Sequence, residues 1–157
     1  MVMIRRAEQA DIPVLNRLLQ QILQVHHVAR PDIFKAEGQK FTTSQLEELL
    51  KNEDKPVFVY EKNGEILGHL FCEIGQADGH VLEPVKTLFI DDLCVDQAAR
   101  GQAIGQQLMD FARAYAKEIG CHNLTLDVWN DNAGATRFYE RLGMTPQKTR
   151  MEMILED

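Results

Sequence analysis

The chain has 157 residues, of which 45% are hydrophobic and 26% charged, a composition typical of one soluble globular domain with its own core. Its net charge of −7 disfavours nucleic acids and anionic membranes as partners, because both are bound through basic surfaces. Three widely separated cysteines include no metal-binding pair. We therefore expect buried free thiols, no metal, and a single cytoplasmic domain over residues 1–157 without a signal peptide or membrane span.

The hydrophobic spacing predicts an α/β chain in which period-two and period-3.6 segments alternate. The expected elements, in chain order, are strand 2–6, helix 12–28, a loop over 27–41, a short helix after Ser44 that ends near Asn52, strand 57–60, strand 66–74, strand 85–95, helix 103–119, strand 123–129, helix 133–142 and strand 148–155. Asn63-Gly64 predicts a hairpin turn, Ser44 and Glu47 a capping box, and Gly68 a bulge. The middle strands form an antiparallel meander, and the C-terminal half is βαβ.

The turn at Arg100–Gly105 is the first candidate site. The apolar strand 87–95 leads into small residues and an amphipathic helix, so free backbone amides and the positive end of a helix dipole converge there. Such a turn binds anions, most simply a phosphate, and Arg100 adds a guanidinium fork. The spacing is neither that of a P-loop nor that of a dinucleotide fingerprint. A tight turn with an exposed arginine is equally compatible with this stretch alone.

A second stretch, residues 130–144, gives that turn a specific interpretation. Arg100-Gly101-Gln102-Ala103-Ile104-Gly105, with Asp96 before it and Leu108 after it, resembles the acetyl-CoA motif Arg/Gln-x-x-Gly-x-Gly/Ala of the GNAT family of N-acetyltransferases. The family's later motif is matched by Asn132, Ala135, Tyr139 and Gly143, with Met144 where the family has Phe. The order of the elements agrees along nearly the whole chain, which makes the two motifs together far more specific than either one.

The resemblance implies the GNAT fold, an α/β architecture whose mixed central sheet is flanked by helices and contains two splayed parallel strands. These strands would be 87–95 and 123–129, and acetyl-CoA, as co-substrate, would enter the gap between them. The implied acetyl-CoA contacts are the backbone of Leu93, Cys94 and Val95, the amides of Arg100, Gly101, Gln102, Ala103, Ile104 and Gly105, and the residues Asn132, Ala135 and Tyr139.

Ala103 departs from the family motif, which has glycine at this position. The alanine Cβ disfavours a positive φ, so the departure would matter if the backbone were left-handed there. We expect the residue to lie in the first turn of the following helix, where φ is negative and the cost is small.

The implied reaction is direct attack of an amine on the thioester carbonyl. An aliphatic ammonium has a pKa of about 10, so it must first lose a proton. Asp91 and Asp92 are adjacent strand residues, of which at most one faces the cleft; we favour Asp92 as the base, with Glu73 as the second candidate, although each is also compatible with an ordinary strand residue. The Val95 amide would stabilise the oxyanion, and Tyr139 would protonate the departing thiolate.

The acceptor site is less defined by the sequence. The candidate acceptor-binding residues are His27, Arg30, Phe34 and Trp129. Trp129 is also compatible with a core position, His26 continues the apolar face of its helix and is expected to pack there, and the place of His69 stays open. Likewise, Tyr139 could be a core aromatic residue and Asn132 a helix cap.

The sequence thus predicts an acetyl-CoA-dependent N-acetyltransferase that acts on a primary amine of a small molecule or a peptide, with a homodimer possible. One alternative is a catalytically inactive acyl-CoA-binding sensor of the same fold, which Ala103 alone supports. Another is a phosphate-binding structural domain without affinity for CoA.

Overall fold

The computed structural model describes residues 1–156 of the chain. These divide into two compact units, Met1–Asp127 and Val128–Asp157, which are taken one at a time below. The expectation of a single domain over the whole chain stays a prediction.

The first unit is built on a five-stranded sheet with strand order β1-β2-β3-β4-β5. The strands are β1 Val2–Arg6, β2 Val57–Lys62, β3 Glu65–Gln76, β4 Lys86–Val95 and β5 Asn123–Leu126. The first three pairings are antiparallel, whereas β4 and β5 run parallel. The mixed sheet expected from the sequence is therefore confirmed, although β5 ends at Leu126 rather than at Trp129.

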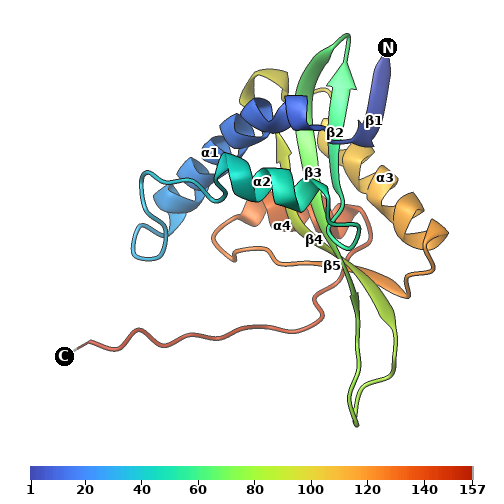
Figure 1. Ribbon diagram of the computed structural model, residues 1–157. Helices are drawn as coiled ribbons and strands as arrows, with labels where there is room; N and C mark the ends of the chain where they lie inside the picture. The colour runs from blue at the N-terminus through green and yellow to red at the C-terminus, as the bar shows by residue number, and fades with distance from the viewer. Residues whose placement is uncertain (157) are drawn as a thin grey trace. The chain divides into compact units, whose positions relative to one another are not determined.

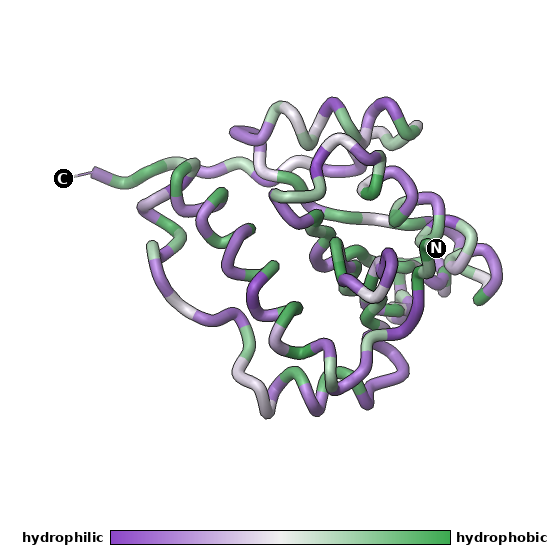
Figure 2. Tube along the Cα trace, turned by 90° about the horizontal axis from the view of Figure 1, so that it is seen from above, coloured by the Kyte–Doolittle hydropathy of each residue, from purple (hydrophilic) through white to green (hydrophobic). Residues whose placement is uncertain are grey.

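Helices cover both faces of this sheet. They are α1 Ile12–Ala29, α2 Thr43–Leu50 and α3 Ile104–Glu118, preceded by the 3-10 turns η1 Gln9–Asp11 and η2 Gln97–Ala99. α1 and α2 pack on one face, through residues such as Leu15 and Leu46, and α3 packs on the other through Leu108 (Figure 1). Hydrophobic and hydrophilic residues alternate along the helices, as expected for helices with one buried face (Figure 2).

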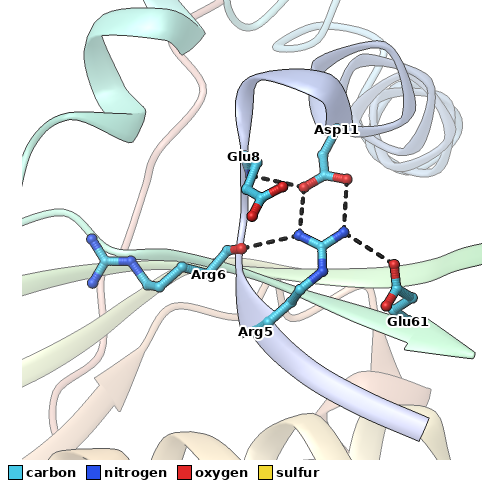
Figure 3. Close-up of polar contacts among 5 residues, drawn as sticks. All are labelled: Arg5, Arg6, Glu8, Asp11 and Glu61. Carbon is cyan, nitrogen blue, oxygen red and sulfur yellow. Dashed lines mark hydrogen bonds and ion pairs between the residues drawn. The ribbon is translucent and has the colours of Figure 1, made fainter. Parts of the chain in front are cut away.

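A partly buried ion pair connects the start of α1 to the edge of the sheet (Figure 3). The guanidinium of Arg5 donates to both carboxylate oxygens of Asp11, at 2.8 and 3.1 Å, and to Glu61 at 3.2 Å. Burial raises the pKa of Asp11, but hydrogen bonds from Arg5 and from the Glu8 amide outweigh it, so this pKa lies below its usual value.

The turns and caps match the sequence with one correction. The hairpin turn at Asn63-Gly64 is confirmed, with φ of 53° and 81°, and the register shift opposite Tyr60 lies beside Gly68, as expected. The capping box of α2, however, is formed by Thr42 and Gln45. The prediction of Ser44 and Glu47 was wrong because Thr42 offers the same chemistry two residues earlier, and the helix begins there.

The second unit contains α4, Ala133–Arg141. The strand predicted over residues 148–155 is wrong, because no strand or helix follows α4 in the described residues. Its alternating apolar side chains have no sheet to pack on: Met151, Met153 and Leu155 are 84%, 83% and 88% exposed. Across residues 1–156, no helix combines the length and the apolar character needed to cross a membrane.

Candidate acetyl-donor and acceptor site

β4 separates from β5 halfway along its length. β5 pairs only with Thr87–Ile90, whereas β3 remains paired with β4 as far as Val95. Among the described residues, the β5-facing edge of residues 91–95 therefore has no strand beside it. This is the splay of parallel strands that the sequence predicts, and it leaves backbone amides and carbonyls open to an extended ligand.

A bulge at Asp91 marks the point of separation. It inserts one extra residue into β4 opposite β3, so the alternation of side chains changes phase. Ile90 before the bulge and Leu93 after it both pack on the core beneath α3. Asp92 and Cys94 consequently face α1, and the Cys94 thiol lies 3.5 Å from a carbonyl oxygen of that helix.

Asp92 meets the one histidine that is fully buried. The Nε2 atom of His69 on β3 contacts the Oδ2 atom of Asp92, whose side chain is 11% exposed. The ring packs edge-to-face on Phe71, with 4.8 Å between ring centroids. Its Nδ1 atom is buried without a hydrogen-bond partner among the described residues.

The end of α1 supplies further groups near Asp92. His26 stacks on Phe34, with 4.7 Å between the ring centroids. Burial lowers the pKa of His26; the negative charge of Asp92 opposes this shift and the positive charge of Lys40 adds to it. Lys40 itself pairs with Asp91 at 2.9 Å. A half-buried imidazole with a lowered pKa thus lies close to a carboxylate.

The predicted acceptor residues of the first unit are held at this same end of α1. His27 Nδ1 bonds the carbonyl of Phe34 at 2.7 Å, and the guanidinium of Arg30 binds the Asp32 carboxylate at 2.8 and 2.9 Å. Both histidines of α1 therefore hold Phe34: its ring stacks on His26, and its carbonyl oxygen bonds His27 Nδ1. His26, expected only to pack, was missed as a neighbour of Asp92 because its position on the apolar face of α1 carries no sign of the carboxylate across from it.

The turn before α3 offers a row of amides. α3 begins at Ile104, so the amides of residues 104–106 have no acceptor within the helix. In the part of the chain that the structure describes, none of the amides of residues 100–106 donates a hydrogen bond to the protein. Together with the helix dipole, this arrangement suits a phosphate or pyrophosphate.

Ala103 is left-handed, not helical. It is the N-cap of α3, with φ of 57° and ψ of 29°, so the expectation of a first-turn conformation with negative φ was wrong. The left-handed residue lets the chain enter the helix while the carbonyls of Gln102 and Ala103 both accept from the Gln107 side chain, at 3.2 and 3.3 Å. Glycine adopts this conformation without steric cost, whereas alanine does not.

Side chains from neighbouring elements fix the turn at both ends. At its start, Asp96 accepts hydrogen bonds from Arg17 at 2.9 Å, from Gln21 at 3.3 Å and from the Ala98 amide at 3.1 Å. Burial raises the pKa of Asp96, but these three donors outweigh it, so the pKa lies below its usual value. At its end, Gln107 is oriented by the hydroxyl of Tyr60, which donates to it at 3.1 Å.

A hollow lies between α1 and the end of β4. The hollow is lined by Gln21, Ile22 and Val25 of α1, Leu93, Cys94 and Val95 of β4, and Gln97 and Arg100 of the turn. The predicted strand contacts and the predicted anion-binding arginine thus share one cavity wall. Glu73 lies apart from them: it is on the β5-paired half of the sheet, opposite Phe89, and pairs with Lys55 at 3.3 Å.

The predicted site residues of the second unit lie on and before α4. Asn132 is the N-cap, and its Oδ1 atom accepts from the Ala135 amide at 3.1 Å, so the capping role is confirmed. Tyr139 is partly buried, with its ring 5.1 Å from that of Phe138. Trp129, which precedes the helix, is 38% exposed. Their roles toward a ligand stay predictions.

Comparison with known proteins agrees with this geometry. The model of the acetyltransferase (GNAT) family matches residues 19–144. An uncharacterised N-acetyltransferase of Bacillus subtilis is 30% identical over 89% of this chain and 87% of its own. A second one, from Methanocaldococcus jannaschii, is 35% identical over 60% of this chain, which spans 41% of that relative's length. A crystal structure of a mutant BH1408 protein from Bacillus halodurans has a TM-score of 0.93 and 30% identity, covering 98% of this chain and 99% of that one.

Proposed function

Because the chain belongs to the acetyltransferase (GNAT) family of enzymes, we propose that it transfers an acetyl group from acetyl-CoA to a primary amine of a small molecule or a peptide. One observation carries the donor half of this proposal. The amides of residues 100–106 and the edge of β4 over residues 91–95 that β5 leaves open are two stretches of backbone without a partner strand or acceptor in the described residues, joined by the η2 turn, whose own amides are hydrogen-bonded. The pyrophosphate of CoA fits the first part and the pantetheine arm, pairing like a strand, fits the second.

Asp92 is the proposed general base. Its carboxylate lies on the α1 side of β4, next to the backbone of Leu93–Val95 where the thioester would lie. A carboxylate there attracts the acceptor ammonium and removes the proton that blocks attack. Glu73 is the weaker candidate because its carboxylate already forms an ion pair with Lys55. It also lies on the half of the sheet where β5 is paired with β4.

The remaining steps use groups predicted from the sequence. As the amine attacks, negative charge develops on the thioester oxygen, for which the Val95 amide is the proposed donor. The C–S bond then breaks, and the thiolate takes a proton from the hydroxyl of Tyr139. Asn132 is the proposed hydrogen-bond partner of the pantetheine, through the side-chain nitrogen that its capping bond does not use.

The transfer is proposed to be direct, without an acetyl-enzyme. The only thiol in the wall of the hollow is that of Cys94. Burial raises its pKa to about 12, and the neighbouring charges of Asp92 and Asp96 add to this shift. A thiol that stays protonated is a poor nucleophile, so the acceptor amine must attack the thioester itself.

A pair of charge variants tests the donor site. Gly105→Asp places a carboxylate at the second position of α3, where the helix dipole tolerates it, but where it would repel a pyrophosphate. Ser44→Asp makes the same change at the second position of α2 and is the control. We expect acetyl-CoA at a thousandfold excess over Kd to stabilise the parent and the control by about 4 kcal/mol, and the Gly105 variant by far less.

Melting temperatures with and without acetyl-CoA measure this difference. No shift in the parent protein would overturn the proposed function and the sensor alternative alike, whereas equal shifts in all three proteins would mean that the pyrophosphate binds elsewhere. If acetyl-CoA binds, release of the CoA thiol with a panel of primary amines separates the enzyme from the sensor. The sensor binds acetyl-CoA and releases no thiol with any amine of the panel.

A further inference from the structure

The buried pair of His69 and Asp92 is unusual in where it lies. His69 is fully buried in the middle of the sheet, on β3, opposite Val59 of β2 and Cys94 of β4. Burying an imidazole costs free energy unless its polar atoms are satisfied. Its single polar contact among the described residues is the one between Nε2 and the Asp92 carboxylate.

The surroundings of the ring select one tautomer. A carboxylate accepts hydrogen bonds, so Nε2 must carry the proton that it donates to Oδ2. The Nδ1 atom has no acceptor near it, so a second proton there would be a buried donor without a partner, which costs more than an unused lone pair. His69 is therefore a neutral donor fixed on Asp92.

The contact leaves the other carboxylate oxygen available. Oδ1 of Asp92 accepts no hydrogen bond from any described residue, and the side chain keeps an 11% exposure. One oxygen is thus held by the buried ring of His69, while the other makes no hydrogen bond within the described residues. A base held in this way presents its lone pair to the acceptor amine without a rotation of the carboxylate.

We propose that His69 is a positioning residue for the acetyl transfer: its Nε2–H holds Oδ2 of Asp92 and directs Oδ1 at the acceptor amine. This inference rests on the proposed role of Asp92 as the base. The charged and titratable groups facing Asp92 are His69 from β3, His26 from α1, Lys40 from the segment before α2, and Asp91 and Cys94 on its own strand.

Three variants separate positioning from packing. His69→Leu removes the donor at similar volume, and His69→Gln returns an N–H close to the place of Nε2. Val59→Ala opens a cavity against the same ring without changing the partner of Asp92. We expect His69→Leu to lower kcat about 10-fold and to move the acidic limb of the pH–rate profile to higher pH. His69→Gln should restore most of both, and Val59→Ala should lower the melting temperature only.

A readout without turnover makes the test independent of the acceptor. The carboxyl ¹³C signal of Asp92, assigned by its loss in Asp92→Asn, should titrate at higher pH in His69→Leu than in the parent or in His69→Gln. If the leucine variant is unfolded at the assay temperature, His69→Met replaces it, and we expect the same shift of the Asp92 titration to higher pH. An unchanged titration midpoint in the folded variant would overturn the role of His69.

The two proposals fail differently. Asp92→Asn should lower kcat about 100-fold or more, and His69→Leu should have little further effect in that background. A fully active Asp92→Asn enzyme would remove Asp92 as the base. An inactive Asp92→Asn enzyme beside an unaltered His69→Leu enzyme would overturn the positioning role alone.

Discussion

At the scale of the residue, Ala103 holds a left-handed backbone at the start of α3 although it carries a Cβ. Its φ is 57°, and the Gln107 side chain donates to the carbonyl oxygens of Gln102 and Ala103. An L-residue with a Cβ pays about 1–2 kcal/mol for this conformation. The turn keeps the geometry nonetheless, because Tyr60, Asp96 and their partners hold it at both ends.

Replacing this alanine with glycine should therefore stabilise the protein. We expect Ala103→Gly to raise the free energy of unfolding by about 0.5–1 kcal/mol, because relief of the left-handed strain exceeds the added entropy of the unfolded chain. Urea denaturation measures the change. Asn63→Gly is the control: its φ of 53° is similar, but asparagine tolerates this region, so the gain should be smaller. Equal gains at both positions would argue against strain at Ala103.

At the scale of the elements, Gly68 lets α3 approach the sheet at the end of β4. A Cβ on this residue would lie 2.9 Å from the carbonyl oxygen of Cys94 and 3.4 Å from Ile104 Cγ2. The glycine therefore permits the close approach of β3 to the Cys94 carbonyl of β4 and to Leu108 of α3, the helix whose first turn carries the proposed pyrophosphate site.

Two alanine variants on β3 test this close approach. Gly68→Ala should destabilise the protein by about 1–3 kcal/mol, since the backbone of β4 or α3 must move to accept the methyl group. Gly75→Ala, on the same strand with nothing within 4 Å of its added Cβ, should be nearly neutral. Thermal unfolding gives the stabilities, and acetyl-CoA affinity should fall in the Gly68 variant only. Loss of affinity in both variants would point to an effect other than this contact.

At the scale of the whole molecule, two buried carboxylates make its stability depend on pH in acid. The pKa values of Asp11 and Asp96 are below those of an unfolded chain, so both stabilise the folded protein above the unfolded pKa of about 4. This contribution is lost as the pH falls through their lowered folded-state values. Neither carboxylate makes stability vary between pH 6 and pH 8.

Asp11→Asn should remove part of that acid dependence. Its free energy of unfolding should fall most at neutral pH and approach that of the parent as the pH falls through the lowered folded-state pKa of Asp11. Asp32→Asn is the control, because the pKa of Asp32 is also lowered, by Arg30, but its side chain is 54% exposed and solvent weakens the pair. Unfolding curves at several pH values compare the three proteins; parallel pH dependence in parent and Asp11 variant would contradict the assignment.

Features that depend on residues close together in the sequence could be predicted, whereas contacts between residues far apart in the chain could not. Periodicity and turn residues predict the helices and most strands because they act within a few residues. The slip of the β4 alternation was even visible in the sequence, since Leu88 and Ile90 are followed by Leu93 and Val95. In contrast, Arg17 reaches Asp96 and Tyr60 reaches Gln107 across the fold, and no local pattern announces such pairs. The strand over residues 148–155 failed for the same reason, because alternation predicts a strand only where another strand is available.

The short pairing of β4 and β5 also has a consequence for motion. In the described residues the ladder of β5 extends only from the pair Thr87–Asn123 to the pair Ile90–Leu126, and no residue of β5 is fully buried, although Leu124 and Leu126 pack against the core. A strand with such a short ladder opens at a lower free energy than the central strands, and its amides exchange with solvent faster. A ligand that adds its own hydrogen bonds along the free edge of β4 would lengthen the ladder at the place where it ends. Binding of a ligand at the donor site should therefore slow the hydrogen exchange of backbone amides in β4 beyond the bulge, before any acceptor is bound.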